Sequence, residues 1–185
     1  MLTLVLGGAR SGKSRYAQSL CADSQSVVFL ATACEQDDPE MRARIDRHRA
    51  ERSGRFDRWK TIEEPQAVVR VVRESEPSAT VLLDCVTTWV ANLAWEQRSL
   101  SATELQNLVI EEVASLAEVA KGREVVAVSN EVGSGIVPEH PSGRHFRDLQ
   151  GAANQHLARE AAYVVLMVSG LPLTLKDERS GSLLG

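Results

Sequence analysis

A glycine-rich segment near the amino terminus, Gly7-Gly-Ala-Arg-Ser-Gly-Lys-Ser14, constrains the fold more than any other feature of the chain. It matches the pattern G-x-x-x-x-G-K-[ST], in which successive backbone N–H groups turn inward around a phosphate chain at the start of a helix. The apolar run 2–6 precedes it, and a stretch of helical period over 13–22 follows it. Because the pattern has physical meaning between a strand and a helix, we predict a phosphate-binding loop here.

The rest of the chain alternates short β-branched runs with stretches of helical period, which is typical of an α/β domain. We predict a P-loop NTPase-like fold with a mostly parallel sheet flanked by helices, in a single domain over residues 1–185. With 43% apolar residues the chain has enough material for one buried core. The expected strands are 2–6, 26–32, 80–84, 124–129, 163–168 and a short terminal one at 172–176, and the expected helices are 13–22, 39–51, 65–74, 86–97, 101–121 and 143–161.

Charge and composition argue against several partners. The formal net charge of -4 lacks the basic excess that attracts nucleic acid or an anionic lipid surface, so we expect neither. The apolar stretches near 81–95 and 161–171 are too short to span a membrane. The three cysteines, Cys21, Cys34 and Cys85, match no zinc spacing, and the amino terminus does not resemble a signal peptide. We therefore expect reduced thiols and a cytoplasmic location.

The phosphate-binding loop also predicts individual roles. The nucleotide is expected to contact the loop itself, while Lys13 reaches the β- and γ-phosphates and the Ser14 hydroxyl is a ligand of Mg²⁺. Two interpretations of Arg10 stay open, a phosphate contact and a solvent-exposed side chain. The predicted loop contacts are Gly7, Gly8, Ala9, Arg10, Ser11, Gly12, Lys13 and Ser14.

An acidic residue ends the expected strand 80–84. Asp84 follows an apolar run, as does the acid that holds Mg²⁺ beside a phosphate-binding loop, directly or through water. The alternative is that Asp84 caps the helix that follows it. Ser14 and Asp84 are thus the predicted metal ligands. Together these motifs predict binding of a nucleoside triphosphate, but they do not distinguish a kinase from an ATPase or a GTPase.

Several further blocks resemble one enzyme family in collinear order. The chain is similar to the bifunctional adenosylcobinamide kinase/adenosylcobinamide-phosphate guanylyltransferases of cobalamin biosynthesis, and the similarity spans nearly its whole length. The chain departs from the family pattern over 52–58, which lacks a proline and makes a longer connection to Trp59. The matching blocks are LGGARSGKSR (6–15), MRARIDRHR (41–49), WKTIEEP (59–65), DCVTTWVANL (84–93), SNEVGSGIVP (129–138), RHFRD (144–148) and GAANQ (151–155).

The resemblance implies two reactions. A nucleoside triphosphate, ATP or GTP, phosphorylates the hydroxyl of adenosylcobinamide, and GMP from GTP is then joined to adenosylcobinamide phosphate with release of pyrophosphate. In the family the second reaction passes through a guanylylated histidine, which corresponds here to His48. A neutral imidazole is available near pH 7 as a nucleophile. The resemblance also implies that the protein is a homo-oligomer.

Other nucleotide contacts follow from the same resemblance. Cys34, Arg49 and Arg52 are expected to contact the nucleotide, and Glu63 to accept hydrogen bonds from the guanine base. Without the resemblance, His48 among its arginines is an ordinary solvated helix face, and Glu63 is an acid at the start of the helix after Pro65.

Asn130 and Glu131 follow a predicted strand end, where they contact a ligand or form a turn. The remaining histidines, His140, His145 and His156, are expected on the surface. Two other functions stay open: a small-molecule kinase without a covalent intermediate, and a non-catalytic nucleotide-binding regulator.

Overall fold

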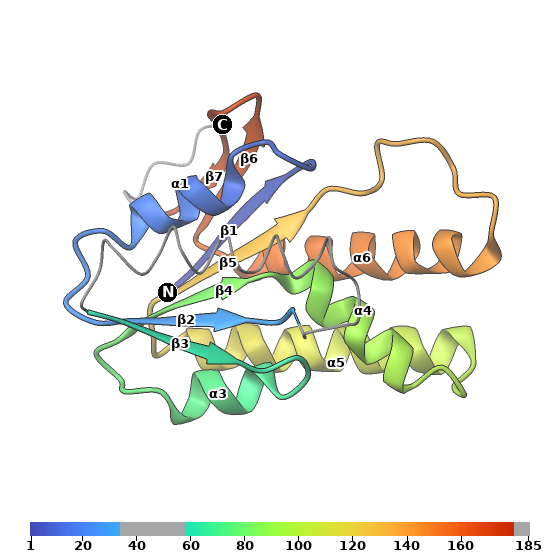
Figure 1. Cartoon of the computed structure of the whole chain (residues 1–185), viewed down its shortest axis with the longest axis horizontal. Helices are drawn as coiled ribbons and strands as arrows, with labels where there is room; N and C mark the ends of the chain where they lie inside the picture. The colour runs from blue at the N-terminus through green and yellow to red at the C-terminus, as the bar shows by residue number, and fades with distance from the viewer. Residues whose placement is uncertain (34–57, 180–185) are drawn as a thin grey trace.

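The computed structural model describes residues 1–33 and 58–179, which form one seven-stranded sheet with helices on both faces (Figure 1). The strand order is β3-β2-β4-β5-β1-β6-β7, and all neighbours are parallel except the antiparallel pair β6 and β7. The strands are β1 (Leu2–Gly7), β2 (Val27–Ala31), β3 (Trp59–Glu63), β4 (Thr80–Asp84), β5 (Val125–Asn130), β6 (Tyr163–Val168) and β7 (Leu171–Asp177). The helices in these ranges are α1 (Lys13–Leu20), α3 (Val68–Glu74), α4 (Val86–Glu96), α5 (Ala102–Ala120) and α6 (Pro141–Glu160).

Apolar residues pack in two clusters, one on each face of the sheet. On one face α1 covers the sheet, and Ala17 packs with Val5, Phe29 and Val165. On the other face α3, α4, α5 and α6 cover it, and Trp89 of α4 is fully buried in the larger cluster. Strands that are covered on both faces must be apolar at every position, which explains why their sequences read as continuous runs. Among the described helices none is both long and apolar enough to cross a membrane.

The predicted fold class is confirmed, with differences at particular elements. Each of the six predicted strands is present, but β3 was missed. It is an edge strand that pairs only with β2, and Lys60, Thr61 and Glu63 are exposed, so its sequence is not an apolar run. Helix α3 begins at Val68 and α6 begins at Pro141, against predicted starts of 65 and 143. The predicted helix 39–51 lies outside the described residues.

Helix α5 shows how local sequence and packing agree. A capping box begins the helix: the Ser101 hydroxyl accepts a hydrogen bond from the Glu104 amide, and the Glu104 carboxylate accepts one from the Ser101 amide. These bonds satisfy amides that have no partner within the helix. The apolar stripe, which includes Leu105, Val109 and Val113, is buried against the sheet.

Candidate nucleotide-binding site

The carboxyl ends of adjacent parallel strands bring the predicted site residues to one edge of the sheet. Gly7, at the end of β1, is in register with Asn130 of β5. Asp84, at the end of β4, is in register with Val128 of β5 on one side and Ala31 of β2 on the other. In open parallel sheets this edge is where ligands bind.

The phosphate-binding loop is shaped mainly by its own backbone. The Ser11 amide donates a hydrogen bond to the Gly8 carbonyl at 3.3 Å, and the Lys13 ammonium donates to the same carbonyl at 3.0 Å. Arg10 and Gly12 have left-handed φ values of 57° and 92°. The loop leads directly into α1, whose first amides point toward the loop as the positive end of the helix dipole. The arrangement is suited to a chain of phosphates.

Two glycines are required by their surroundings. A Cβ atom on Gly7 would lie 2.9 Å from the carbonyl oxygen of Met167 and would also collide with the Ser11 hydroxyl. Gly12 has a left-handed φ, and a Cβ atom added to it would lie 3.4 Å from the Cα atom of Gly170. The Gly170 amide donates to the Ser11 carbonyl at 3.0 Å. The turn between β6 and β7 therefore packs against the phosphate-binding loop and holds its shape.

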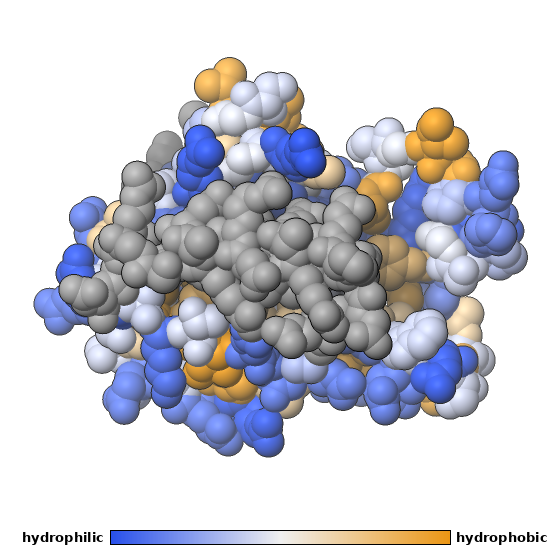
Figure 2. All heavy atoms as spheres, in the orientation of Figure 1, coloured by the Kyte–Doolittle hydropathy of each residue, from blue (hydrophilic) through white to orange (hydrophobic). Residues whose placement is uncertain are grey.

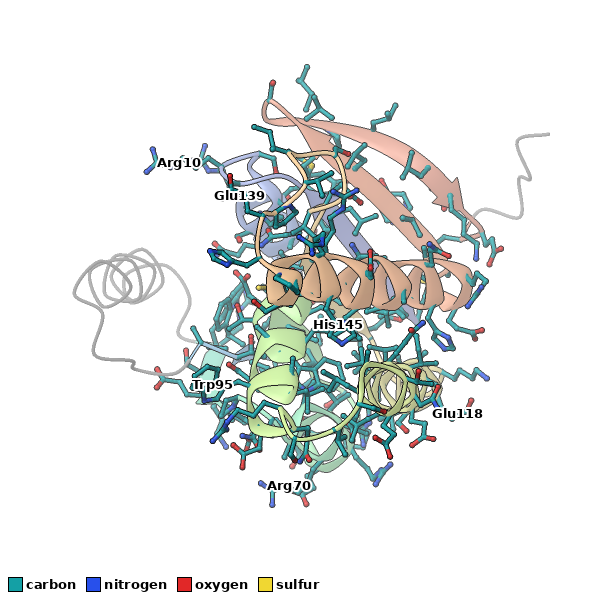
Figure 3. All side chains as sticks on the ribbon, turned by 90° about the vertical axis from the view of Figure 1, so that its right-hand side faces the viewer. Arg10, Arg70, Trp95, Glu118, Glu139 and His145 are labelled. Carbon is teal, nitrogen blue, oxygen red and sulfur yellow. The ribbon has the colours of Figure 1, made fainter. Side chains whose placement is uncertain are left out.

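Side chains of the loop differ in their exposure. Ser11 is buried, and its hydroxyl has no hydrogen-bond partner within the described part of the chain. Lys13 is 8% exposed. Arg10 is exposed, and Figure 3 shows its side chain directed away from the sheet, which agrees with the solvent interpretation. A buried hydroxyl with unused bonding capacity in this loop can bond a phosphate oxygen.

Asp84 and Lys13 act electrostatically on the same thiol. Burial raises the pKa of Cys85, and the negative charge of Asp84 raises it further, while Lys13 works in the opposite direction. Both charges therefore lie within electrostatic range of the Cys85 thiol. Helix α4 has Cys85 as its N-cap and no side-chain cap. The alternative in which Asp84 caps this helix is thus wrong.

Thr32 fastens the ends of β2 and β4 to each other. Its hydroxyl donates to the Cys85 carbonyl at 2.8 Å and accepts from the Cys85 amide at 3.0 Å. The side-chain amide of Asn92 donates to the Thr32 carbonyl at 2.8 Å and to that of Pro65 at 3.0 Å. These bonds join the segment just after β2 to the segment just after Asp84, and so hold the Asp84 carboxylate in place at the carboxyl end of the sheet.

The two predicted metal ligands fit Mg²⁺ in their chemistry. Ser14 lies in the first turn of α1 and Asp84 ends β4, and both are half-buried. The described residues contain no group of three or more His, Cys, Asp or Glu side chains that would form an all-protein metal site. Mg²⁺ does not need one, because it commonly takes one or two carboxylates together with substrate phosphates and water.

Glu63 ends β3 and is exposed at the same sheet edge, in register with Ala31. The role of helix-start acid belongs to its neighbour Glu64, whose carboxylate accepts hydrogen bonds from the amides of Gln66 and Ala67, both at 3.0 Å. Arg70 pairs with Glu64 at 3.3 Å. Burial opposes ionisation of Glu64, but these hydrogen bonds and the arginine outweigh it and lower its pKa.

A buried polar cluster beneath the end of β5 had no role in the sequence analysis. The Ser129 hydroxyl donates to the side-chain oxygen Oδ1 of Asn154 at 2.6 Å, and the side-chain amide of Gln150 donates to the Ser129 hydroxyl and to the same Oδ1, both at 2.9 Å. Thr87 accepts from the Asn130 amide at 2.7 Å, and Asn154 donates to the Asn130 carbonyl at 3.0 Å. The one available signal was Ser129, a polar residue that follows the apolar run 125–128.

The loop that follows β5 starts with a turn. The Glu131 carboxylate accepts from the Gly133 amide at 2.7 Å, which agrees with the turn interpretation of this residue. The Glu131 amide donates to the Gly7 carbonyl at 3.1 Å, so this loop and the phosphate-binding loop leave the sheet side by side. Of the three histidines expected on the surface, His140 is exposed, while His145 and His156 are half-buried and the Nε2 atom of His145 is enclosed.

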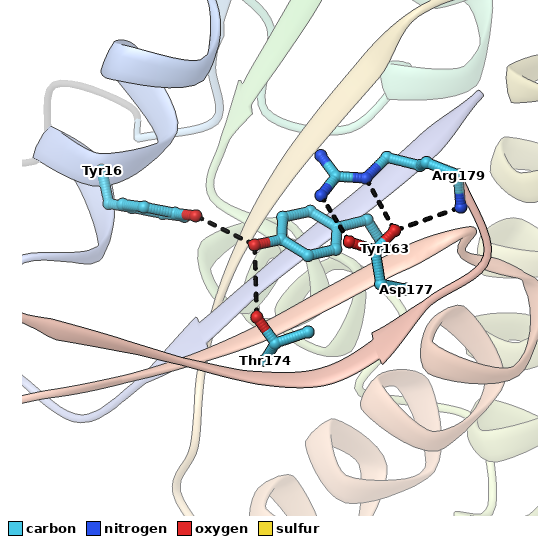
Figure 4. A network of polar contacts seen from close by, with 5 residues as sticks. All are labelled: Tyr16, Tyr163, Thr174, Asp177 and Arg179. Atoms are coloured by element: carbon cyan, nitrogen blue, oxygen red, sulfur yellow. Dashed lines mark hydrogen bonds and ion pairs between the residues drawn. The ribbon is translucent and has the colours of Figure 1, made fainter. Parts of the chain in front are cut away.

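Two tyrosines connect helix α1 with strands β6 and β7 (Figure 4). The hydroxyls of Tyr16 and Tyr163 are 3.1 Å apart, and that of Tyr163 is 3.4 Å from the Thr174 hydroxyl. Arg179 stacks over the Tyr163 ring at 3.4 Å from its centre and pairs with Asp177 at 2.7 Å. Burial, and then the bond to Tyr163, raises the pKa of Tyr16 to about 12. The tyrosine therefore stays neutral at physiological pH.

Four predicted site residues, Cys34, His48, Arg49 and Arg52, lie outside the described residues, so their roles stay predictions. The structure does bring together the phosphate-binding loop, Lys13, Ser14 and Asp84 at one edge.

Comparisons with known proteins agree on one family. A family model described as CobU, cobinamide kinase / cobinamide phosphate guanyltransferase, matches residues 3–175. The chain is 42% identical to the bifunctional adenosylcobalamin biosynthesis protein CobU of Escherichia coli (strain K12), covering 95% of this chain and 100% of the relative. It is 40% identical to the CobU protein of Salmonella typhimurium, with 95% and 100% covered, and 39% identical to the CobP protein of Pseudomonas aeruginosa, with 96% and 99% covered.

Proposed function

Because the chain belongs to the cobinamide kinase / cobinamide phosphate guanyltransferase family, we propose that both reactions of this enzyme use the sheet edge formed by β1, β4 and β5. The enzyme is a transferase of cobalamin biosynthesis, and nucleoside triphosphates are its substrates. The observation that carries the proposal is the phosphate-binding loop at the end of β1, where Lys13 bonds the Gly8 carbonyl, together with Asp84 at the end of β4 in the same parallel sheet. The corrinoid acceptor is adenosylcobinamide in the first reaction and its phosphate in the second.

In the kinase reaction, the triphosphate of ATP or GTP lies in the loop 7–14. The acceptor hydroxyl attacks the γ-phosphorus, the bond to the β–γ bridging oxygen breaks, and a nucleoside diphosphate leaves. Lys13 neutralises charge that builds on the β- and γ-phosphates, and the loop amides hold the chain in line. Bound Mg²⁺, held by Ser14 and Asp84, would supply further neutralisation of phosphate charge.

In the guanylyltransfer reaction, a neutral imidazole nitrogen of His48 attacks the α-phosphorus of GTP. A P–N bond forms and pyrophosphate leaves. A phosphate oxygen of adenosylcobinamide phosphate then attacks the same phosphorus, so that the histidine is released and a corrinoid diphosphate ester of guanosine forms. We assign nucleotide contacts to Cys34, Arg49 and Arg52. Glu63 is the acceptor for the guanine N1–H and N2–H, a role supported by its exposure at the same edge.

The test is to incubate the protein and Mg²⁺ with GTP labelled at the α- or γ-phosphate and to separate the products under denaturing conditions. We expect acid-labile α-label, and no γ-label, on the wild type and on His156→Ala, a control histidine in α6. His48→Ala should carry none. Retention of α-label by His48→Ala would place the intermediate elsewhere. Absence of α-label from all proteins, with γ-transfer to the corrinoid intact, would favour a kinase without a covalent intermediate, and absence of any turnover would favour a regulator.

We also propose a cytoplasmic homo-oligomer. The free thiols of Cys21 and Cys85 suit a reducing compartment. Leu171, Leu173 and Leu175 of the edge strand β7 are 72%, 55% and 55% exposed, an apolar surface suited to a second copy. Light scattering should give a multiple of the 20.2 kDa chain mass for the wild type and a smaller mass for Leu173→Lys. A wild-type mass of one chain at micromolar concentration would refute the oligomer.

A further inference from the structure

The loop 131–140, between β5 and α6, presents large apolar side chains to solvent. Ile136 is 97% exposed and Val137 is 59% exposed, and Figure 2 shows apolar side chains on the surface where the loop between β5 and α6 projects, at the upper right of the view. The loop leaves the sheet beside the phosphate-binding loop, through the bond from the Glu131 amide to the Gly7 carbonyl, and projects beyond the sheet edge (Figure 1). Isolated exposed apolar residues are common on protein surfaces, so exposure alone does not identify Ile136 and Val137 as a binding surface. Their position beside the phosphate-binding loop and the contacts that hold the loop are the relevant evidence.

The far end of the loop is held by the start of α6. The Arg144 guanidinium donates to the carbonyls of Pro138 and Glu139, at 3.0 Å and 2.5 Å. Pro138 also packs so closely on Gly143 that a Cβ atom there would lie 2.8 Å from the proline Cβ. These contacts fix the chain immediately after Val137.

The near end of the loop is held by the buried polar cluster of Thr87, Ser129, Gln150 and Asn154. The cluster binds both the amide and the carbonyl of Asn130. Gln150 is fully buried, and such a network is costly to bury unless its geometry is well defined. With both ends fixed, the tip does not depend on burying its own apolar side chains, and Ile136 and Val137 stand clear of the core.

The composition of the loop indicates what it contacts. Residues 131–140 contain no Lys or Arg and carry Glu131 and Glu139, so the loop is unsuited to a polyphosphate. The proposed guanine acceptor Glu63 lies on β3, three strands from β5 and therefore about 14 Å along the edge. Neither the phosphates nor the base of the nucleotide is expected at the loop. The acceptor is the remaining reactant.

We infer that Ile136 and Val137 form the apolar contact that holds the corrinoid acceptor beside the phosphate-binding loop. The inference rests on the proposed function, because it takes the acceptor to be a corrinoid. A corrin ring offers broad apolar faces, and an Ile-Val pair gains free energy by covering such a face. The polar cluster and Arg144 act through the loop as positioning residues.

The test compares the double variant Ile136→Ser/Val137→Ser with the wild type. We expect the KM for adenosylcobinamide in the kinase reaction to rise about tenfold or more, since apolar contact area is lost on one reactant. The KM for the nucleotide and the α-label from GTP should stay within twofold. Equilibrium dialysis of adenosylcobinamide without nucleotide should show the same loss of affinity. Trp95→Ser, which removes another exposed apolar side chain at 71% exposure, is the control and should change neither KM.

An unchanged corrinoid KM and corrinoid affinity in the double variant would overturn the inference. An equal rise of both KM values with a lower melting temperature would also overturn it, because it would show a structural role alone. The conservative variant Ile136→Leu separates these cases, since it should keep the corrinoid KM of the wild type. If the wild type turns over no corrinoid, the proposed function fails and the inference fails with it. If the wild type turns over corrinoid and the double variant has the same corrinoid KM, only the inference fails.

Discussion

The phosphate-binding loop and the loop 131–140 leave neighbouring strands at the same edge, but different forces hold them. The first is shaped by its backbone, with left-handed residues at Arg10 and Gly12 and the Ser11 amide bonded to Gly8. The second is held at both ends by side chains, among them Gln150 and Asn154 of α6. A backbone-shaped loop leaves its amides directed at a ligand, while a loop held by side chains leaves its tip free to present whatever residues it carries.

This difference predicts where each loop is sensitive to substitution. The backbone-shaped loop should fail when a side chain is added at a glycine, because φ or a close approach then changes. The loop held by side chains should fail when a polar group is removed from beneath it. The following predictions test that contrast, and they begin with the largest effect.

Gly12→Ala should lower nucleotide affinity roughly a hundredfold. A Cβ atom at φ 92° is strained, and relaxation would misplace the loop amides and Lys13. Gly122→Ala, at an exposed turn with nothing within 4 Å of the added carbon, is the control and should bind as the wild type does. Titration calorimetry with GTP measures both. Equal affinities for the two variants would mean that the loop does not depend on its backbone conformation.

Asn154→Leu should lower the free energy of unfolding by about 2–4 kcal/mol, because it removes the acceptor of the Ser129 hydroxyl, one of the two acceptors of the Gln150 side chain and the donor to the Asn130 carbonyl. Gln155→Leu alters the exposed neighbour and should cost less than about 0.5 kcal/mol. Urea denaturation gives both values. A loss below about 1 kcal/mol for Asn154→Leu would show that the cluster does not hold the loop.

Glu64→Gln should have the smallest effect, about 0.5–1 kcal/mol at pH 7, because one half-buried carboxylate supports the turn before α3. The pKa of Glu64 is lowered from 4.5 in the folded protein, so its stabilisation is present above pH 4.5 and is lost as the pH falls through the folded pKa. The difference between wild type and variant should therefore shrink below pH 4.5 in denaturation curves. A difference that does not vary with pH would exclude the carboxylate charge as its source.

The accuracy of the structure predicted from the sequence depended on the range of the contacts that form each feature. The strands of the sheet centre were predictable because burial on both faces favours runs of apolar residues, as in the run 81–83 before Asp84. Strand β3 was not predicted, because it is an edge strand with Lys60 and Thr61 exposed and therefore has no run of apolar residues. The sequence also did not predict that Glu64, and not Glu63, accepts hydrogen bonds from the amides of Gln66 and Ala67 before α3, since adjacent acids look alike until the turn is formed.

The sequence by itself determined the phosphate-binding loop, because the required glycines, lysine and helix start lie within eight consecutive residues and act locally. Tertiary structure alone decided the neighbours of that loop. Gln150 and Asn154 resemble the polar face of an exposed helix, and only the packing of α6 beneath β5 turns them inward to Ser129 and the Asn130 carbonyl. The physical reason is that a buried polar group must find its partner wherever the fold places one, and here the partners come from α4, β5 and α6.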